Sequence, residues 1–362
     1  MNNEILKIIE AGIKNDSNKV INYAYHLANS VEISGDNKFA EKIRKVIVEN
    51  NTRVATLDRL TSKPLDREGK MDMIDITIPY GDENPLFFDS IIENEIETFI
   101  MTYLKKDELE ARGIECTNNL LLYGPPGTGK TSLAKYISFQ TNLPLLTVRM
   151  DALISSLLGN TAKNIRKVFD YASSQKCILF LDEFDVIAKL RNDKTEIGEL
   201  KRVVNSLIQN IDNFPNDCIL IAATNHAELL DTAIWRRFNK VIELELPMCE
   251  IRRELIKEYS SILENDYMKD SKKVDILVDL TKFLSPALIK NIINNAAKRA
   301  LLNGAEHMSY SDLIKEIYLY TDKKPTEKNL VKFLYEAGIS QKDISEISKL
   351  SLRRVREFIK EM

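Results

Sequence analysis

A glycine-rich loop that ends in a lysine and a threonine has the clearest chemical use in this sequence. Residues 124–131 follow the apolar run 120–123 and precede a helical pattern. Glycines let successive backbone N–H groups curve around an anion, and the new helix adds its unpaired N-terminal donors. The alternative is a chance glycine turn before a helix. The residues expected to bind a nucleotide here are Gly124, Pro125, Pro126, Gly127, Thr128, Gly129, Lys130, Thr131 and Ser132.

Within this loop, the lysine and the threonine have different expected tasks. We expect Lys130 to reach the β- and γ-phosphates of ATP, and the Thr131 hydroxyl to hold Mg²⁺. About fifty residues later, the apolar run 178–181 ends in two carboxylates, Asp182 and Glu183. Asp182 is expected to hold the same hydrated Mg²⁺, and Glu183 to orient and deprotonate the attacking water. Taken alone, the two acids would equally suit the cap of a following helix.

Three further polar residues follow the next apolar run, 219–223. Asn225 can hold the attacking water or a γ-phosphate oxygen without competing for the metal, although such an Asn is also an ordinary turn residue. Arg236 and Arg237 can stabilise the charge that spreads over the γ-phosphate oxygens when the bond breaks, if a neighbouring subunit supplies them. Otherwise they are a solvated basic pair. The expected catalytic residues are Glu183, Asn225, Arg236 and Arg237.

The strands and helices expected to position these residues predict an α/β fold. From residue 120 to residue 244, apolar runs alternate with helical patterns. Continuous apolar runs are typical of a parallel sheet that helices cover on both faces. Polar residues just after such strands line the ligand crevice at the carboxyl edge. Before this region, residues 3–50 predict three short helices, and residues 51–84 are polar and turn-rich, with one alternating stretch at 73–78 that suits a short strand.

The composition of the chain bears on its binding partners and its cellular location, but not on its substrate. The 362 residues carry a net charge of -3, which gives no global reason to expect nucleic-acid or membrane binding. Four cysteines lie far apart, without a C-x-x-C pair, so a metal or redox role is not expected. The sequence shows no signal peptide and no apolar stretch long enough to span a bilayer. We therefore expect a cytoplasmic protein without a membrane partner.

Together these motifs resemble the AAA+ ATPases, specifically their AAA clade, over residues 87–302. The loop 124–131 is similar to Walker A, 178–183 to Walker B, and 223–225 to sensor 1. Residues 230–240 resemble the second region of homology, with Arg236 and Arg237 at its two arginine-finger positions. Here the arginines are adjacent, without the two residues that many members place between them, so which one acts as the finger is left open.

The resemblance implies a P-loop NTPase core with a helical lid. Its expected domains are an N-terminal bundle (1–50), a linker (51–84), the α/β core (85–247), the lid (248–322) and a small all-α C-terminal domain (323–362). It also implies a homo-oligomeric ring, commonly a hexamer, with ATP and Mg²⁺ at subunit boundaries. Leu157 stands at the pore-loop position where translocating members carry an aromatic residue, which weakens the case for threading a polypeptide.

The C-terminal residues predict three helices, at 329–337, 341–348 and 352–360. The last two resemble a helix-turn-helix of the resolvase or sigma-factor kind, in which the final helix exposes Arg353, Arg354, Arg356 and Lys360. DNA binding through residues 338–360 and a protein-interaction domain both remain open.

Three functions are compatible with this sequence. The first is an ATPase that remodels a protein partner, and the second is a DNA-linked ATPase switch or loader. The third is a regulatory subunit of a separately encoded protease or effector. The intact set of Lys130, Asp182, Glu183 and Asn225 argues against an inactive nucleotide sensor.

Overall fold

The computed structural model describes residues 73–79, 85–153, 158–186, 197–322 and 326–361, together with Leu27 and Lys42. The chain divides into two compact units, Met1–Pro64 and Leu65–Met362. All helices and strands given below belong to the second unit. Apart from Leu27 and Lys42, the predicted N-terminal bundle lies outside the described residues, as does the pore-loop residue Leu157, so both remain predictions.

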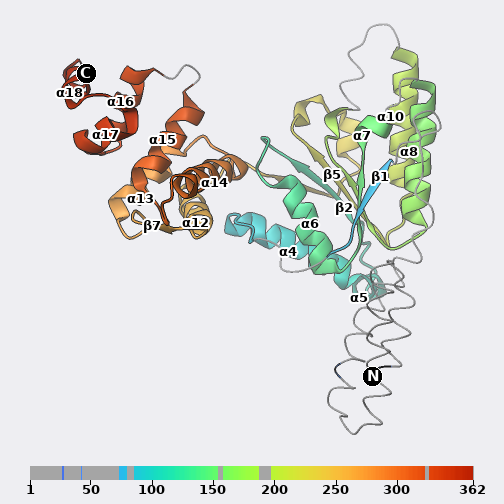
Figure 1. The fold of residues 1–362 in the computed structure, drawn as a ribbon. Coiled ribbons are helices and arrows are strands. Elements are labelled where there is room, and N and C mark those ends of the chain that lie inside the picture. The colour runs from blue at the N-terminus through green and yellow to red at the C-terminus, as the bar shows by residue number, and fades with distance from the viewer. Residues whose placement is uncertain are drawn as a thin grey trace. The chain divides into compact units, whose positions relative to one another are not determined.

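A six-stranded sheet forms the centre of the α/β region (Figure 1). Its order is β1-β3-β4-β5-β2-β6, and every neighbouring pair is parallel except β1 and β3. The mixed α/β class and the largely parallel sheet predicted from the apolar runs are confirmed. The antiparallel edge strand β1 is the short strand expected at 73–78. The strands are β1 Ile74–Thr77, β2 Asn119–Tyr123, β3 Leu145–Val148, β4 Ile178–Leu181, β5 Ile219–Thr224 and β6 Lys240–Glu243.

Helices cover both faces of this sheet (Figure 1). On strand β2, Leu120 and Leu122 belong to the apolar cluster with α4 and α6, whereas Leu121 belongs to the cluster with α7, α8 and α10. This alternation follows from the two-residue side-chain period of a strand. The helices of this region are α4 Ser90–Leu104, α5 Lys106–Ala111, α6 Lys130–Thr141, α7 Met150–Leu153, α8 Leu158–Ser173, α10 Ile197–Asp212, the 3₁₀ turn η2 Ala227–Leu229 and α11 Thr232–Trp235.

A helical region follows β6. Its helix α14 begins with Ser285 at the N-cap and Pro286 in the first turn. Ser285 makes no side-chain capping bond, however, and its buried hydroxyl has no hydrogen-bond partner within the described part of the chain. The elements are α12 Cys249–Ser260, α13 Ser271–Leu280, α14 Pro286–Leu302, α15 Tyr310–Thr321 and the two-stranded sheet of β7 Glu264–Asn265 and β8 His307–Met308.

The three predicted C-terminal helices are present as α16 Glu327–Glu336, α17 Gln341–Ser348 and α18 Leu352–Lys360. Their buried side chains belong to the same apolar cluster as those of α12–α15. Two polar bonds add to this packing: the Tyr310 hydroxyl donates to the Ala337 carbonyl (3.0 Å), and Lys315 Nζ donates to the Ile347 carbonyl (3.3 Å). Helices α12–α15 and the C-terminal helices α16–α18 therefore pack around one core.

Within the described ranges, none of the helices has the length and apolar character needed to cross a membrane. The domain boundaries proposed from the sequence stay predictions.

Candidate nucleotide-binding site

The loop between β2 and α6 has the backbone shape that an anion cradle requires. Gly124, Gly127 and Gly129 have φ angles of 140°, 79° and 106°, which side-chain-bearing residues rarely adopt. Helix α6 begins directly after Gly129 and directs its unpaired N–H groups into the loop. Residues 126–132, including Ser132, line a cavity of about 680 Å³, whereas Gly124 and Pro125 lie outside its lining. This volume is within the usual range for a small-ligand pocket.

Lys130 supplies positive charge to this loop. Its side chain is buried, and its Nζ donates to the carbonyl oxygens of Gly124 and Pro125, each at 2.8 Å. Burial lowers the pKa of Lys130, while the nearby charges of Asp182 and Asp185 act to raise it. A phosphate group would provide the ammonium with stronger, charge-assisted bonds than these two carbonyls do.

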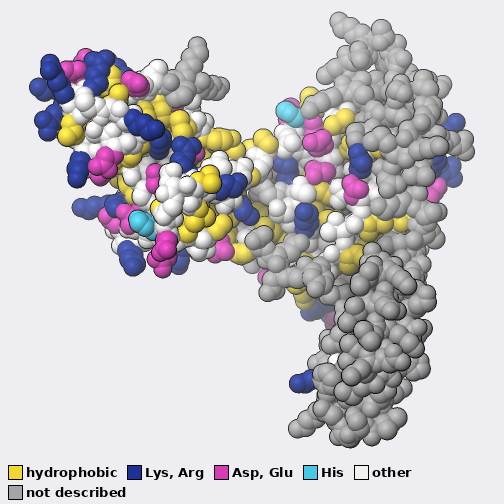
Figure 2. All heavy atoms as spheres, in the orientation of Figure 1, with side chains coloured by type: hydrophobic (Ala, Val, Ile, Leu, Met, Phe, Trp, Pro, Cys, Tyr) yellow, Lys and Arg dark blue, Asp and Glu magenta, His cyan; other side chains and the backbone are white. Residues whose placement is uncertain are grey.

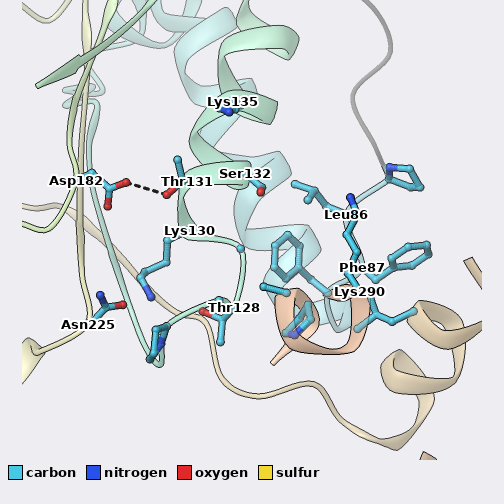
Figure 3. Close-up of a pocket in the computed structure, with 18 of the residues that line it drawn as sticks. Leu86, Phe87, Thr128, Lys130, Thr131, Ser132, Lys135, Asp182, Asn225 and Lys290 are labelled. Atoms are coloured by element: carbon cyan, nitrogen blue, oxygen red, sulfur yellow. Dashed lines mark hydrogen bonds between the residues drawn. The ribbon is translucent and has the colours of Figure 1, made fainter. Parts of the chain in front are cut away.

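Thr131 and Asp182 come from different elements and meet directly. Thr131 lies in the first turn of α6, and Asp182 follows β4. The Thr131 hydroxyl donates to Asp182 Oδ2 at 2.8 Å (Figure 3). A hydroxyl and a carboxylate are hard oxygen ligands of the kind that Mg²⁺ prefers, and Mg²⁺ commonly takes only one or two protein ligands beside phosphate and water. The donor set therefore fits Mg²⁺ bound together with a triphosphate.

The sheet order explains why these residues meet. Strand β5 lies between β4 and β2, so the carboxyl ends of all three strands are neighbours. The Phe184 N–H donates to the Ala223 carbonyl (2.9 Å), which ties the turn after β4 to the end of β5. Glu183 and Asn225 both line the cavity with the glycine-rich loop. Figure 3 shows Asp182 and Asn225 on the same side of Lys130 and Thr131.

Glu183 has an unusual backbone. Its φ is 52°, in the left-handed region, and its N–H donates to Asp182 Oδ1 at 2.9 Å. A residue with a side chain in this conformation costs about 1–2 kcal/mol relative to the right-handed region. Such strain concentrates at functional sites, where the surrounding structure maintains it.

The other end of the cavity was not predicted from the sequence. It is lined by Leu86, Phe87 and Phe88, which precede α4, and by Tyr259 and Lys290 of the helical region. Lys290 Nζ lies 5.5 Å from the centre of the Tyr259 ring. Aromatic and apolar side chains suit a flat base, whereas the loop end suits phosphates. These residues belong to no local motif, so only the folded chain reveals them.

The helical region also bonds directly to the loop. The Ala287 N–H, in the first turn of α14, donates to the Gly127 carbonyl at 3.2 Å. A side-chain Cβ placed at Gly127 would lie 2.6 Å from the Ser285 hydroxyl. The start of α14 therefore packs closely against the loop that would hold the phosphates.

The structure distinguishes Arg236 from Arg237, and neither of them lines the cavity. Arg237 is partly buried; it pairs with Asp212 through Nε and Oδ1 at 3.1 Å and donates to the Ala233 carbonyl at the same distance. Arg236 is exposed, and its guanidinium makes no hydrogen bond or ion pair with the residues that the structure describes. Arg237 is thus held by contacts within its own chain, whereas Arg236 is exposed to solvent.

Gly124 provides a test of how tightly the loop packs. A Cβ at this position would lie 2.2 Å from the backbone carbonyl oxygen of Leu244. Leu244 cannot easily move away, because its N–H donates to the Tyr123 carbonyl. We expect Gly124→Ala to lower the free energy of unfolding by about 1–3 kcal/mol, because overpacking adds to the φ strain. Urea denaturation would measure it. Gly113→Ala is the matched control, since Gly113 has a φ of 79° but no atom within 4 Å of the added Cβ. Equal losses in both variants would contradict the close contact.

Comparison with known proteins agrees with this geometry. Residues 120–246 match the family described as "ATPase family associated with various cellular activities (AAA)". The chain is 41% identical over 180 residues to an uncharacterized AAA family ATPase of Sinorhizobium fredii, covering 50% of this chain and 54% of the relative. It is 36% identical over 244 residues to a proteasome-activating nucleotidase of Sulfurisphaera tokodaii, covering 65% and 62%.

A third relative is a putative 26S proteasome regulatory subunit homolog of Methanocaldococcus jannaschii, 35% identical over 218 residues, which cover 59% of this chain and 57% of the relative. The chain thus spans a little over half the length of the curated relatives that it matches.

Proposed function

We propose that the protein hydrolyses ATP with Mg²⁺ and uses the energy to rearrange a protein partner, because residues 120–246 match the AAA ATPase family. One observation carries the proposal. A lysine and a hydroxyl from α6, two carboxylates that follow β4 and an amide that follows β5 line one cavity, beside the anion cradle that follows β2. This set matches the needs of phosphoryl transfer to water, in which catalysis is mainly positioning and electrostatic stabilisation.

Each side chain has a distinct task in this proposal. The loop N–H groups and Lys130 bind the β- and γ-phosphates, and Thr131 and Asp182 hold the metal. When bound, Mg²⁺ would neutralise phosphate charge. Glu183 accepts a proton from the attacking water, and Asn225 orients that water towards the γ-phosphate. The buried position of Lys130 keeps its charge little screened by water, which strengthens its attraction to the phosphates.

We further propose that the active species is a homo-oligomeric ring, with six subunits as the expected number. The placement of Arg236 supports this: it is exposed and lies outside its own subunit's cavity, as a residue must be if it acts on a neighbour's nucleotide. Arg237, bonded to Asp212, is assigned the supporting role of holding the segment after α11 in place.

The identity of the partner rests on the relatives. Two of them are named for the proteasome, so a polypeptide substrate is the favoured partner class. A regulatory subunit that controls a separately encoded protease or effector would use the same nucleotide chemistry. The two roles differ in whether an unfolded protein accelerates hydrolysis.

Phosphate release from ATP, measured over a range of protein concentrations, tests the proposal. We expect turnover with Mg²⁺, its loss when EDTA removes the metal, and a rise in specific activity as subunits associate. Added unfolded protein should accelerate turnover in the remodelling role. If Mg²⁺-ATP is not hydrolysed at any protein concentration, with or without unfolded protein, the proposal fails.

A further inference from the structure

The three C-terminal helices have the internal geometry of a helix-turn-helix. Helices α17 and α18 are joined by residues 349–351 only. Lys349 turns the chain with a φ of 59°, a left-handed conformation that permits so short a connection. Ser351 then caps α18 by accepting the N–H of Arg354. Ile344 of α17 and Val355 of α18 are both 0% exposed, which fixes the two helices against each other.

Helix α18 presents a basic face on the side opposite its buried residues. At 100° per residue, Arg353, Arg356 and Lys360 fall within about one sixth of the helix circumference, opposite Val355 and Phe358. All three are exposed, and the Arg353 side chain is 91% exposed. Figure 2 shows Lys and Arg side chains gathered over the C-terminal helices.

Neighbouring contacts fix parts of this face in position. Arg356 Nε donates to Gln341 Oε1 of α17 at 3.3 Å, and the Arg354 guanidinium lies 4.5 Å from the centre of the Phe358 ring. Lys342 and Lys349 are also exposed, on α17 and in the turn. The basic residues thus span both helices of the motif.

Acidic residues reduce this charge without removing it. Residues 341–361 contain six basic and four acidic side chains, within a chain whose net charge is -3. Glu357 pairs with Arg353 and Arg354, and such exposed pairs are weak and break readily. Asp343 accepts a hydrogen bond from the Ser340 hydroxyl at the start of α17. On α18 itself, four basic residues outweigh the single acid Glu357.

We propose that α18 binds in the major groove of double-stranded DNA, with Arg353, Arg356 and Lys360 contacting phosphates and base edges. Three observations favour this ligand over others. The major groove of B-DNA is wide enough for one helix, whereas the major groove of duplex RNA is too narrow. Exposed basic residues extend from the first turn of α18 to its last residue, at Arg353, Arg356 and Lys360. The basic residues lie on the exposed face of that helix, where a docked recognition helix meets the duplex. This inference is independent of ATP hydrolysis.

Fluorescence anisotropy with a labelled 30-base-pair duplex tests it, using the full chain at 50–200 mM salt. We expect wild-type protein to bind, with an affinity that falls steeply as salt rises. Arg353→Glu/Arg356→Glu should weaken binding about a hundredfold, because each arginine is worth at least about tenfold, and should lower the salt slope by about two. Circular dichroism and ATP turnover should stay unchanged.

The matched control is Arg112→Glu/Arg166→Glu. These two arginines are also exposed, each pairs with an acid four residues away in the sequence, and their substitution changes the net charge by the same amount. This control should bind DNA like wild type. The inference is overturned if wild-type protein does not bind the duplex at 50 mM salt, if both double variants lose affinity equally, or if the Arg353→Glu/Arg356→Glu protein binds undiminished. The inference is also overturned if the protein binds duplex RNA more tightly than duplex DNA, or if it binds an acidic protein but not DNA.

Discussion

Glu183→Gln should lower kcat for ATP hydrolysis by about a hundredfold to ten-thousandfold while ATP binding is retained. Glutamine has nearly the shape of glutamate but cannot accept the proton of the attacking water. Lys130, Thr131 and Asp182, which hold the phosphates and the metal in our proposal, are untouched by the change. Steady-state phosphate release gives kcat, and binding of a fluorescent ATP analogue gives Kd. The variant should therefore accumulate as an ATP-bound assembly.

A contrary result would be informative in two ways. If Glu183→Gln hydrolyses ATP at the wild-type rate, Glu183 is not the general base. If ATP binding is lost together with turnover, the change has disturbed the metal site through the bond between the Glu183 N–H and Asp182. Thr102→Val, at a half-buried position of α4 outside the cavity lining, serves as the control for purification and folding.

Arg236→Ala should lower kcat by about a thousandfold or more, the range found for arginines that stabilise a transferring phosphoryl group. Arg237→Ala should lower kcat by less than about tenfold, because Arg237 is engaged with Asp212 and the Ala233 carbonyl. The half-exposed Arg237–Asp212 pair is worth about 1 kcal/mol or less, so its loss should appear as a small decrease in thermal stability. Measuring kcat and Tm for both variants separates these two roles.

Mixing subunits tests whether Arg236 acts across an interface. Lys130→Ala subunits lack ATP binding but keep Arg236, whereas Arg236→Ala subunits keep an intact pocket. A mixture should regain part of the activity, because a Lys130→Ala neighbour supplies Arg236 to the intact pocket. If the mixture is no more active than its separate components while the subunits co-assemble, Arg236 does not work in trans.

The sequence predicted those parts of the fold and site that local patterns encode. The glycine-rich loop, the apolar strands just before Asp182 and Asn225, and the three C-terminal helices could each be predicted from a short stretch of sequence. Their structural placement agrees with the prediction, because continuous apolar runs allow few arrangements other than a covered parallel sheet.

What the sequence did not predict depends on contacts between distant segments. The base end of the cavity combines Phe87 with Tyr259 and Lys290, which are more than 150 residues away along the chain. Likewise, the difference between Arg236 and Arg237 depends on Asp212, at the end of α10. No spacing rule relates such residues, since their proximity arises only from tertiary packing.

The left-handed backbone at Glu183 implies that the residue best for thermal stability at this position differs from the residue best for ATP turnover. Glycine would relieve about 1 kcal/mol or more of conformational strain there. A selection for thermostability alone would therefore favour glycine and produce a stable protein that lacks the general base that we propose. Laboratory evolution of this chain should accordingly retain a selection for activity whenever residue 183 is allowed to vary.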